Sequence, residues 1–128
     1  MAFQFDLVSP ERKLASTAAD AVDIPGSQGD FTAMGEHEPV LTTLRPGFIK
    51  VTSGSDVQEY LVTGGFVEVS AEAASVLAEK ALPKAEVSRE TIEEMVSGLE
   101  ASAATLEGAA KDAATKRIAD TKALLDQL

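Results

Sequence analysis

The sequence has no cysteine, no tryptophan and a single histidine among its 128 residues. The absence of cysteine excludes disulfide bonds, thiol catalysis and cysteine-based metal sites. No stretch approaches the roughly 20 consecutive apolar residues that a membrane-spanning helix needs. The N-terminus lacks the basic region and apolar core of a signal peptide. We therefore expect a cytoplasmic protein whose association with a membrane is made through a partner.

Positive charge is also scarce, since the formal net charge is −10 and the eleven Lys and Arg residues are scattered. Nucleic-acid binding needs clustered cations, so this composition argues against it. The single histidine, His37, has no second histidine at metal-ligand spacing, and Glu36-His37-Glu38 is more typical of a solvated or contact loop than of a general base. The run Gly26-Ser27-Gln28-Gly29 is not followed by the Gly-Lys-Ser/Thr of a phosphate-binding loop.

The first 83 residues show the alternation that is typical of β-strands. Phe3, Phe5 and Leu7 alternate with polar residues, as a strand buried on one face requires. Further strands are expected at 22–24, 48–52, 57–63, 66–69 and 75–79, with turns at 53–56 and 64–65. Because no helical segment separates these strands, the pattern favours a sandwich or a flattened barrel over a parallel sheet.

Beyond Pro83 the apolar period changes from two to about 3.6. Ser88 is a suitable N-cap for a first helix, and Gly108 is the natural break before a second. The expected apolar stripe of the first helix is Ile92, Met95, Val96, Leu99, Ala103 and Leu106, and that of the second is Ala110, Ala114, Ile118, Leu125 and Leu128. We expect an antiparallel two-helix hairpin over residues 84–128, with a hinge at Leu82–Val87.

The segment from Val22 to Gly47 is rich in turn-forming residues and is predicted to be one long surface connection. Pro25-Gly26 and Gln28-Gly29 interrupt a short apolar run, and Pro46-Gly47 precedes the next expected strand. Since the segment contains no catalytic set of residues, we expect it to be a contact surface.

In order and identity these residues resemble the epsilon subunit of bacterial F-type ATP synthase, whose mitochondrial counterpart is called delta. Most of the specificity lies in the G-S-x-G-[DE] run at Gly26–Asp30, in His37-Glu38-Pro39 and in Pro46-Gly47, and Gly64–Val69 follows in the family's order. The last part of the chain matches in length and character, not in motif. The resemblance implies an α+β fold: an antiparallel β-sandwich at residues 1–83, followed by the C-terminal helical hairpin.

The resemblance also implies a function and a place in the cell. Members of this family are non-catalytic subunits of the central stalk, the rotor that couples the c ring and the gamma subunit to rotary ATP synthesis. The sandwich binds gamma and the c ring, at the cytoplasmic face of the bacterial inner membrane. The segment that touches the c ring corresponds to the Val22–Gly47 segment, so the expected contact residues are Asp30, Phe31, Met34 and His37.

In some members the C-terminal hairpin extends along gamma, reaches the alpha and beta subunits and blocks ATP hydrolysis. Basic residues of the second helix then meet an acidic segment of the beta subunit. The residues to which this role would transfer are Lys111, Lys116, Arg117 and Lys122. The alternative is an ordinary surface helix with i,i+4 ion pairs, such as Asp112 with Lys116.

Two other classes of function compete with a rotor subunit. One is a free-standing β-sandwich that binds a small ligand or carbohydrate. Such modules usually expose aromatic side chains, whereas this chain has one tyrosine, Tyr60, within a strand pattern. The other is a hydrolase with an unrecognised pair of carboxylates, which the lack of a nucleophile and of a partner for His37 disfavours.

We predict that the chain binds no cofactor and that millimolar ATP gives no saturable heat in a calorimetric titration. Members that bind ATP in the hairpin have an [IL]-D-x-x-R-A motif at the start of the first helix. At the comparable place this chain has Val87-Ser88-Arg89-Glu90-Thr91-Ile92, where serine replaces the aspartate and the arginine-alanine pair is missing. A clear binding isotherm would contradict this prediction.

Overall fold

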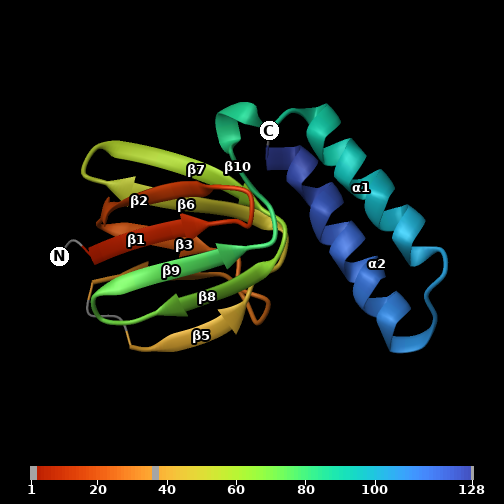
Figure 1. The fold of residues 1–128 in the computed structure, drawn as a ribbon, viewed down its shortest axis with the longest axis horizontal. Coiled ribbons are helices and arrows are strands. Elements are labelled where there is room, and N and C mark those ends of the chain that lie inside the picture. Colours follow the sequence, from red (N-terminus) through yellow and green to blue (C-terminus); the bar gives the residue numbers. More distant parts are fainter. Residues whose placement is uncertain (1–2, 36–37, 128) are drawn as a thin grey trace. The chain divides into compact units, whose positions relative to one another are not determined.

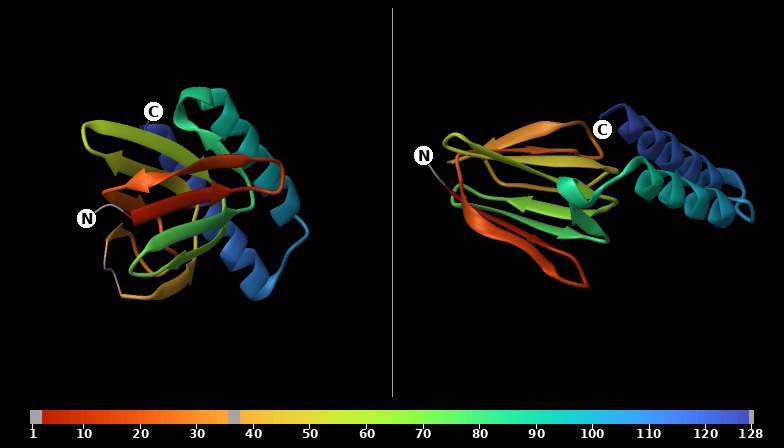
Figure 2. Two further views of the ribbon diagram at one scale, coloured as in Figure 1. Left: turned by 60° about the vertical axis from the view of Figure 1, so that its left-hand side comes forward. Right: turned by 90° about the horizontal axis from the view of Figure 1, so that it is seen from above.

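The computed structural model describes residues 3–35 and 38–127. The chain forms two compact units, Met1–Lys84 and Ala85–Leu128. The first unit consists of β-strands in two layers, which the right-hand view of Figure 2 shows as separate sheets, and the second consists of two antiparallel helices (Figure 1). The predicted fold class, a β-sandwich followed by a helical hairpin, is confirmed.

Within the described residues the strands form two five-stranded sheets. The first sheet contains, in spatial order, β2 (Lys13–Ala19), β1 (Phe3–Val8), β9 (Ala73–Ala78), β8 (Gly65–Val69) and β5 (Val40–Thr43). The second contains β10 (Ala81–Pro83), β7 (Asp56–Val62), β6 (Gly47–Ser53), β3 (Ala21–Ile24) and β4 (Phe31–Met34).

Neighbouring strands are antiparallel, as expected, except that β1 pairs with β9 in parallel. In this pair Phe5 lies opposite Ala74 and Leu7 opposite Val76. A parallel pair needs a long connection, usually a helix. Here the other strands of the sandwich provide that connection, so the lack of a crossover helix did not exclude parallel pairing.

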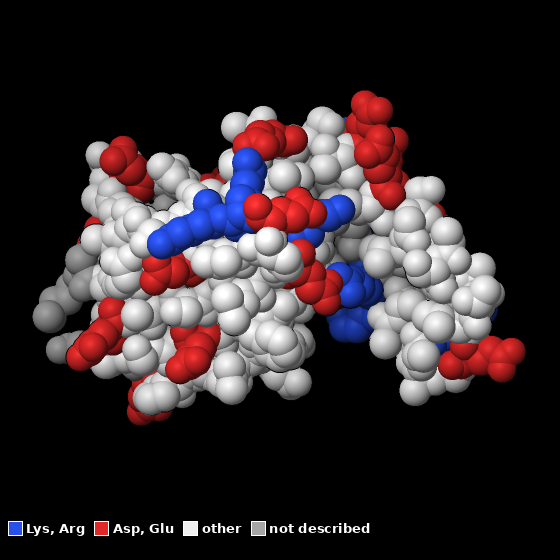
Figure 3. All heavy atoms as spheres, viewed as in Figure 1, with Lys and Arg blue, Asp and Glu red and all other residues white. Residues whose placement is uncertain are grey.

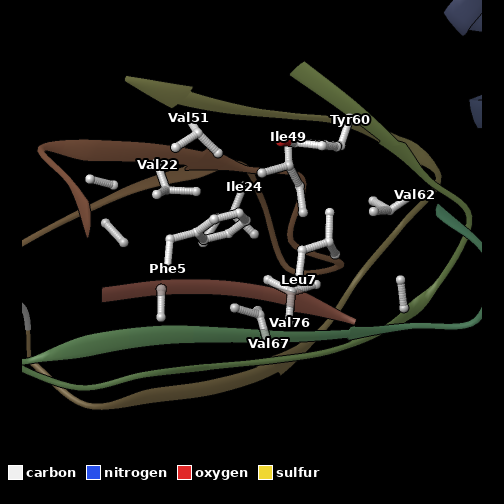
Figure 4. Close-up of a cluster of buried hydrophobic side chains, with 14 of the residues drawn as sticks. Phe5, Leu7, Val22, Ile24, Ile49, Val51, Tyr60, Val62, Val67 and Val76 are labelled. Carbon is white, nitrogen blue, oxygen red and sulfur yellow. The ribbon is translucent and has the colours of Figure 1, made fainter. Parts of the chain in front are cut away.

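The core lies between the two sheets. Side chains such as Phe5 and Leu7 from the first sheet and Ile24 and Ile49 from the second point into the space between the layers (Figure 4). Phe5, Leu7 and Ile49 are completely shielded from solvent. Burial of one such side chain is worth about 1.5–3 kcal/mol, so this interior is the main source of stability of the sandwich.

Four strands were not predicted, namely β2, β4, β5 and β10. Val22–Gly47 is therefore not one surface connection: it contains the end of β3, all of β4 and β5, and the first residue of β6. Val22 and Ile24 are buried core residues. None of these four strands has large apolar residues recurring with a period of two, and pairing with a neighbour decides their conformation.

The expected hinge at Leu82–Val87 is only partly a connection. Leu82 and Pro83 belong to β10 and lie opposite Leu61 and Tyr60 of β7. Proline is tolerated there because β10 is an edge strand, where no further strand needs its missing N–H. The 3₁₀ turn η1 (Lys84–Glu86) follows.

The first helix, α1 (Arg89–Ala103), begins as predicted at Ser88. The Ser88 hydroxyl accepts a hydrogen bond from the Thr91 backbone N–H at 3.2 Å, and the Thr91 hydroxyl accepts one from the Ser88 N–H at 3.2 Å. This reciprocal arrangement is a capping box and satisfies N–H groups that the first turn leaves unpaired. The expected stripe supplies the buried residues of α1, namely Ile92, Val96 and Ala103.

The second helix, α2 (Gly108–Ala123), continues into the 3₁₀ turn η2 (Leu124–Gln127). Gly108 is its first residue, with a φ of 64°. The expected stripe was partly wrong: Ala110 is exposed, whereas Thr121 and Leu124 are buried. Thr121 is tolerated in the buried row because its hydroxyl donates to the Arg117 carbonyl at 2.7 Å. Leu128 lies outside the described residues.

None of the helices in the described part of the chain has the length and apolar character needed to cross a membrane.

We predict that Leu7→Ala lowers the free energy of unfolding of the sandwich by about 2–5 kcal/mol, because it opens a cavity in a closely packed core. Leu77→Ala is the matched control, since Leu77 lies on the neighbouring strand but is 60% exposed. It should change stability by less than about 0.5 kcal/mol. Urea unfolding followed by tyrosine fluorescence reports on the sandwich specifically, since Tyr60 is the only tyrosine and there is no tryptophan. Equal losses in both variants would contradict the assigned core.

Candidate functional site

The residues expected to contact the c ring lie at one edge of the second sheet. Asp30 immediately precedes β4, and Phe31 and Met34 are the first and last residues of that strand. β4 is an edge strand, with β3 as its neighbour. His37, the fourth expected residue, lies outside the described residues. The structure therefore brings three of the four to one short stretch of surface.

Within β4 the side chains alternate between the core and the surface. Phe31 is half-buried and packs against the core cluster, and Ala33 is buried. Met34 is 55% exposed, so it offers more apolar surface to a partner than Phe31 does. Of the two apolar residues expected to make contact, Met34 is exposed to a partner, whereas the ring of Phe31 mainly packs against the core of the sandwich.

Asp30 is not a free acid. Nη2 of Arg45 donates a hydrogen bond to Oδ1 of Asp30 and forms an ion pair with it. The Asp30 side chain is 64% exposed and that of Arg45 is 32% exposed. Arg45 was not among the expected contact residues, although it directly precedes the Pro46-Gly47 motif.

The two motifs meet because the Pro25–Asp30 turn lies against the segment Thr43–Gly47. Gly26 and Leu44 form an isolated antiparallel bridge between them. The segments are joined by hydrogen bonds from Ser27 N–H to the Thr43 carbonyl (2.9 Å), between the Ser27 and Thr43 hydroxyls (2.5 Å), and from Arg45 N–H to the Pro25 carbonyl (3.0 Å). We call this interlocked pair of segments the turn clamp.

Two glycines allow the turn clamp to close. A Cβ atom on Gly26 would lie 2.6 Å from the carbonyl oxygen of Gly29, and one on Gly47 would lie 2.7 Å from the Cβ of Pro25. Real Cβ atoms do not approach other atoms so closely, and a side chain at either position would force the segments apart. The glycines of both motifs therefore permit close backbone approach.

A second surface feature lies on the outer face of the first sheet. Leu41, Phe66 and Leu77 are exposed by 73%, 57% and 60%. Phe66 lies directly opposite Leu77, and Leu41 lies one strand further, in β5. We call these three side chains the apolar patch. Figure 3, which has the viewpoint of Figure 1, shows mostly uncharged atoms over the right-hand ends of β8 and β9.

The other half of the same face is polar. The Gln4 side-chain amide donates to the Ser16 hydroxyl at 3.0 Å and to Oδ1 of Asp6 at 3.2 Å. Hydrogen bonds from Ser16 and then from Gln4 lower the pKa of Asp6, with a smaller contribution from the charge of Lys13. The apolar patch is thus bordered by hydrogen-bonded side chains on β1 and β2.

A cavity of about 270 Å³ lies between β1 and β2 on one side and β6 and β7 on the other. Polar side chains, including those of Thr17, Ser53 and Asp56, line it together with Tyr60. The Tyr60 hydroxyl donates to Oε1 of Gln58 at 2.6 Å, and burial raises the pKa of Tyr60. The described lining includes no histidine, lysine or cysteine.

Residues 3–35 and 38–127 contain no group of three or more His, Cys, Asp or Glu side chains placed to hold a metal ion.

The basic residues of α2 do not share one face. At about 100° per residue, Lys111 and Lys122 point about 20° apart, whereas Lys116 points about 140° away from Lys111. The Nζ of Lys116 pairs with Asp120 at 3.0 Å, so the expected partner Asp112 was wrong. Arg117 is half-buried, on the side of the helix that includes Thr121. Lys111 and Lys122 are thus the two that form a common exposed surface.

Comparison with known proteins places these features in a family. A family model described as the beta-sandwich domain of the ATP synthase delta/epsilon chain matches residues 2–84. An ATP synthase epsilon chain of Jannaschia sp. (strain CCS1) is 46% identical over 125 residues, which cover 98% of this chain and 95% of the relative. The epsilon chain of Rhodobacter capsulatus is 50% identical over 121 residues, with coverage of 94% and 92%.

Two solved structures share the fold. One is a cryo-EM structure of the Euglena gracilis mitochondrial ATP synthase (OSCP/F1/c-ring), with a TM-score of 0.73 and 19% identity over 97% of this chain and 81% of that one. The other is the central stalk and c ring of the Tetrahymena thermophila mitochondrial enzyme, with a TM-score of 0.72 and 20% identity over 99% and 96%. At this level of identity the likeness shows a common fold.

We predict that Gly26→Ala lowers the free energy of unfolding of the sandwich by about 1–3 kcal/mol, because the new methyl group collides with backbone that cannot move aside alone. Ser27→Ala, the neighbouring control, removes one exposed hydroxyl contact and should cost no more than about 1 kcal/mol. Urea unfolding followed by Tyr60 fluorescence measures both. A Gly26→Ala variant as stable as the wild type would show that the turn clamp is looser than described.

Proposed function

This chain belongs to the delta/epsilon family of ATP synthase subunits, and on that premise we propose that it is the non-catalytic central-stalk subunit of a bacterial F-type ATP synthase. Similarity to bacterial epsilon chains over almost the whole length of both proteins is the observation that supports this proposal most directly. In this role the chain couples gamma and the c ring to rotary ATP synthesis. It is peripheral to the cytoplasmic face of the inner membrane and is held there by the complex.

For the gamma subunit we propose the apolar patch as the contact surface. Exposed apolar side chains scattered singly are ordinary, but Phe66 and Leu77 are paired across strands and Leu41 is close by. A rotor subunit must remain attached to the shaft while torque passes through it. An apolar centre with a polar border, here formed by Gln4 and Asp6, is the common anatomy of a stable protein interface.

For the c ring we propose the surface around Asp30 and Met34, with His37 beside them in the chain. Phe31 supports this surface from below, since its ring packs against the core. The turn clamp is a suitable element for a contact under load, because hydrogen bonds on both sides hold its backbone. The sandwich, residues 1–83, thus provides both rotor contacts.

For the hairpin, residues 84–128, we propose a regulatory contact with the alpha and beta subunits in which Lys111 and Lys122 take part. They are exposed on a common side of α2. Lys116 is paired with Asp120, and Arg117 is half-buried, so both fit the alternative of an ordinary surface helix better.

The proposal is tested by affinity purification of the tagged chain from its native membranes. The wild type should bring gamma together with the alpha and beta subunits. The double variant Phe66→Ser/Leu77→Ser should recover at least about tenfold less gamma, because two central apolar contacts are lost. Val57→Ser, a control at a residue of the second sheet that is 50% exposed, should behave as the wild type.

Recovery of the wild-type chain alone would overturn the assignment to the central stalk. Full recovery of gamma by the double variant, with partners present in the wild type, would overturn only the choice of the apolar patch. Unfolding of the double variant in urea distinguishes a lost contact from a lost fold.

A further inference from the structure

The ion pair between Asp30 and Arg45 joins two motifs that are fifteen residues apart in sequence. Exposed ion pairs contribute little to the stability of a fold. Removal of this pair should therefore leave the sandwich intact. The stability of the fold does not explain why the ion pair is present. What the pair does change is the direction and the charge of the carboxylate at the edge of the sheet.

Arg45 is well placed to direct that carboxylate because its own backbone is fixed. Its N–H donates to the Pro25 carbonyl at 3.0 Å. The following residue is Pro46, whose ring restricts the chain, and Gly47 lies close against Pro25. The guanidinium thus extends from an anchored point of the turn clamp, so little backbone entropy is lost when it binds Asp30.

The backbone of Asp30 is held on both sides as well. The preceding residue, Gly29, donates its N–H to the Gly26 carbonyl at 3.1 Å. The following residue, Phe31, lies opposite Ile24 in the β3–β4 pair. With both backbones held, the ion pair mainly selects one rotamer of the Asp30 side chain.

Arg45 occupies only one of the two carboxylate oxygens. Its contact is to Oδ1, while the Asp30 side chain as a whole remains 64% exposed. A carboxylate accepts several hydrogen bonds, so Oδ2 remains able to accept one from a partner. The charge of the guanidinium offsets that of the carboxylate, which weakens the attraction of the pair for a second cation.

We propose that Arg45 is a positioning and specificity residue of the c-ring contact. It holds Asp30 so that Oδ2 accepts a hydrogen bond from an uncharged donor of the partner, such as a side-chain amide, a hydroxyl or a backbone N–H. This inference rests on the proposed function, and it adds a residue and a type of donor that the function alone does not specify.

The experiment measures binding of the full-length chain to native membranes from which it has been removed, by co-sedimentation. Asp30→Asn and Arg45→Gln should each raise the dissociation constant about two- to fivefold. The double variant should be no weaker than the weaker single variant, because the two side chains act as one unit. Arg45→Lys should recover part of the loss, since lysine restores the charge but not the planar geometry.

Arg89→Gln is the matched control, because Arg89 forms an exposed ion pair with Glu93 at 3.1 Å, within α1. It should bind as the wild type. All variants should have the wild-type midpoint of urea unfolding by Tyr60 fluorescence, which separates positioning from a loss of fold.

Salt concentration tests the type of donor. The informative variant is Arg45→Gln, which keeps the Asp30 carboxylate but lacks the exposed ion pair that salt would itself screen. The ratio of its dissociation constant to that of Arg89→Gln should not rise between about 50 and 300 mM salt, because a neutral donor is insensitive to screening. A ratio that rises as salt is added would show a cationic partner and overturn this part of the proposal.

The remaining outcomes are distinguishable. If Asp30→Asn binds as the wild type, the proposed contact of Asp30 with the c ring is wrong, and the role of Arg45 with it. If Asp30→Asn weakens binding and Arg45→Gln does not, or if their effects add in the double variant, the contact stands and the positioning role is overturned.

Discussion

The parallel pairing of β1 with β9 is the constraint on which the rest of the sandwich depends. It joins the beginning of the domain to nearly its end, so the first sheet cannot be completed until almost all of the domain has been made. The same pair places Phe5 and Leu7 at the centre of the core. Pairing across so long a separation in sequence carries a high loop-closure cost, and the buried area between the sheets must offset that cost.

The sequence revealed the parts of this fold in which large apolar residues recur at a regular period. Phe3, Phe5 and Leu7 indicated β1, and Ser88 indicated the start of α1, because these signals are local. Lys13–Ala19 offered no comparable signal: Leu14 is its only large apolar residue, and the strand exists through its pairing with β1. The parallel pairing of β1 with β9 could not be predicted from local sequence patterns, because the order of strands in a sheet depends on how the two sheets pack together.

The candidate site divides in the same way. Its glycines were predictable as turns, and the motif located Asp30. The ion pair of Asp30 with Arg45 was not predictable, because between these residues the chain forms β4 in the second sheet and then β5 in the first. For the apolar patch, two of the three residues were predicted to lie in strands, but their exposure was not predicted. Phe66 and Leu77 were predicted to be strand residues. Which face of their strands is buried depends on where the second sheet packs, so only the exposure of these two side chains in the structure distinguishes them from core residues.

The end of β10 is held within the first unit by Lys84, the residue that directly follows this strand. Nζ of Lys84 lies 3.2 Å from Glu59 and 5.2 Å from the centre of the Phe48 ring, so the chain is secured to the second sheet at the last residue of the first unit. Between Lys84 and the helix cap at Ser88 only a short tether remains, with a reach of at most about 14 Å. The pairing of β10 and the contacts of Lys84 lie wholly within the first unit, so the strand keeps these contacts whatever conformation the helices adopt.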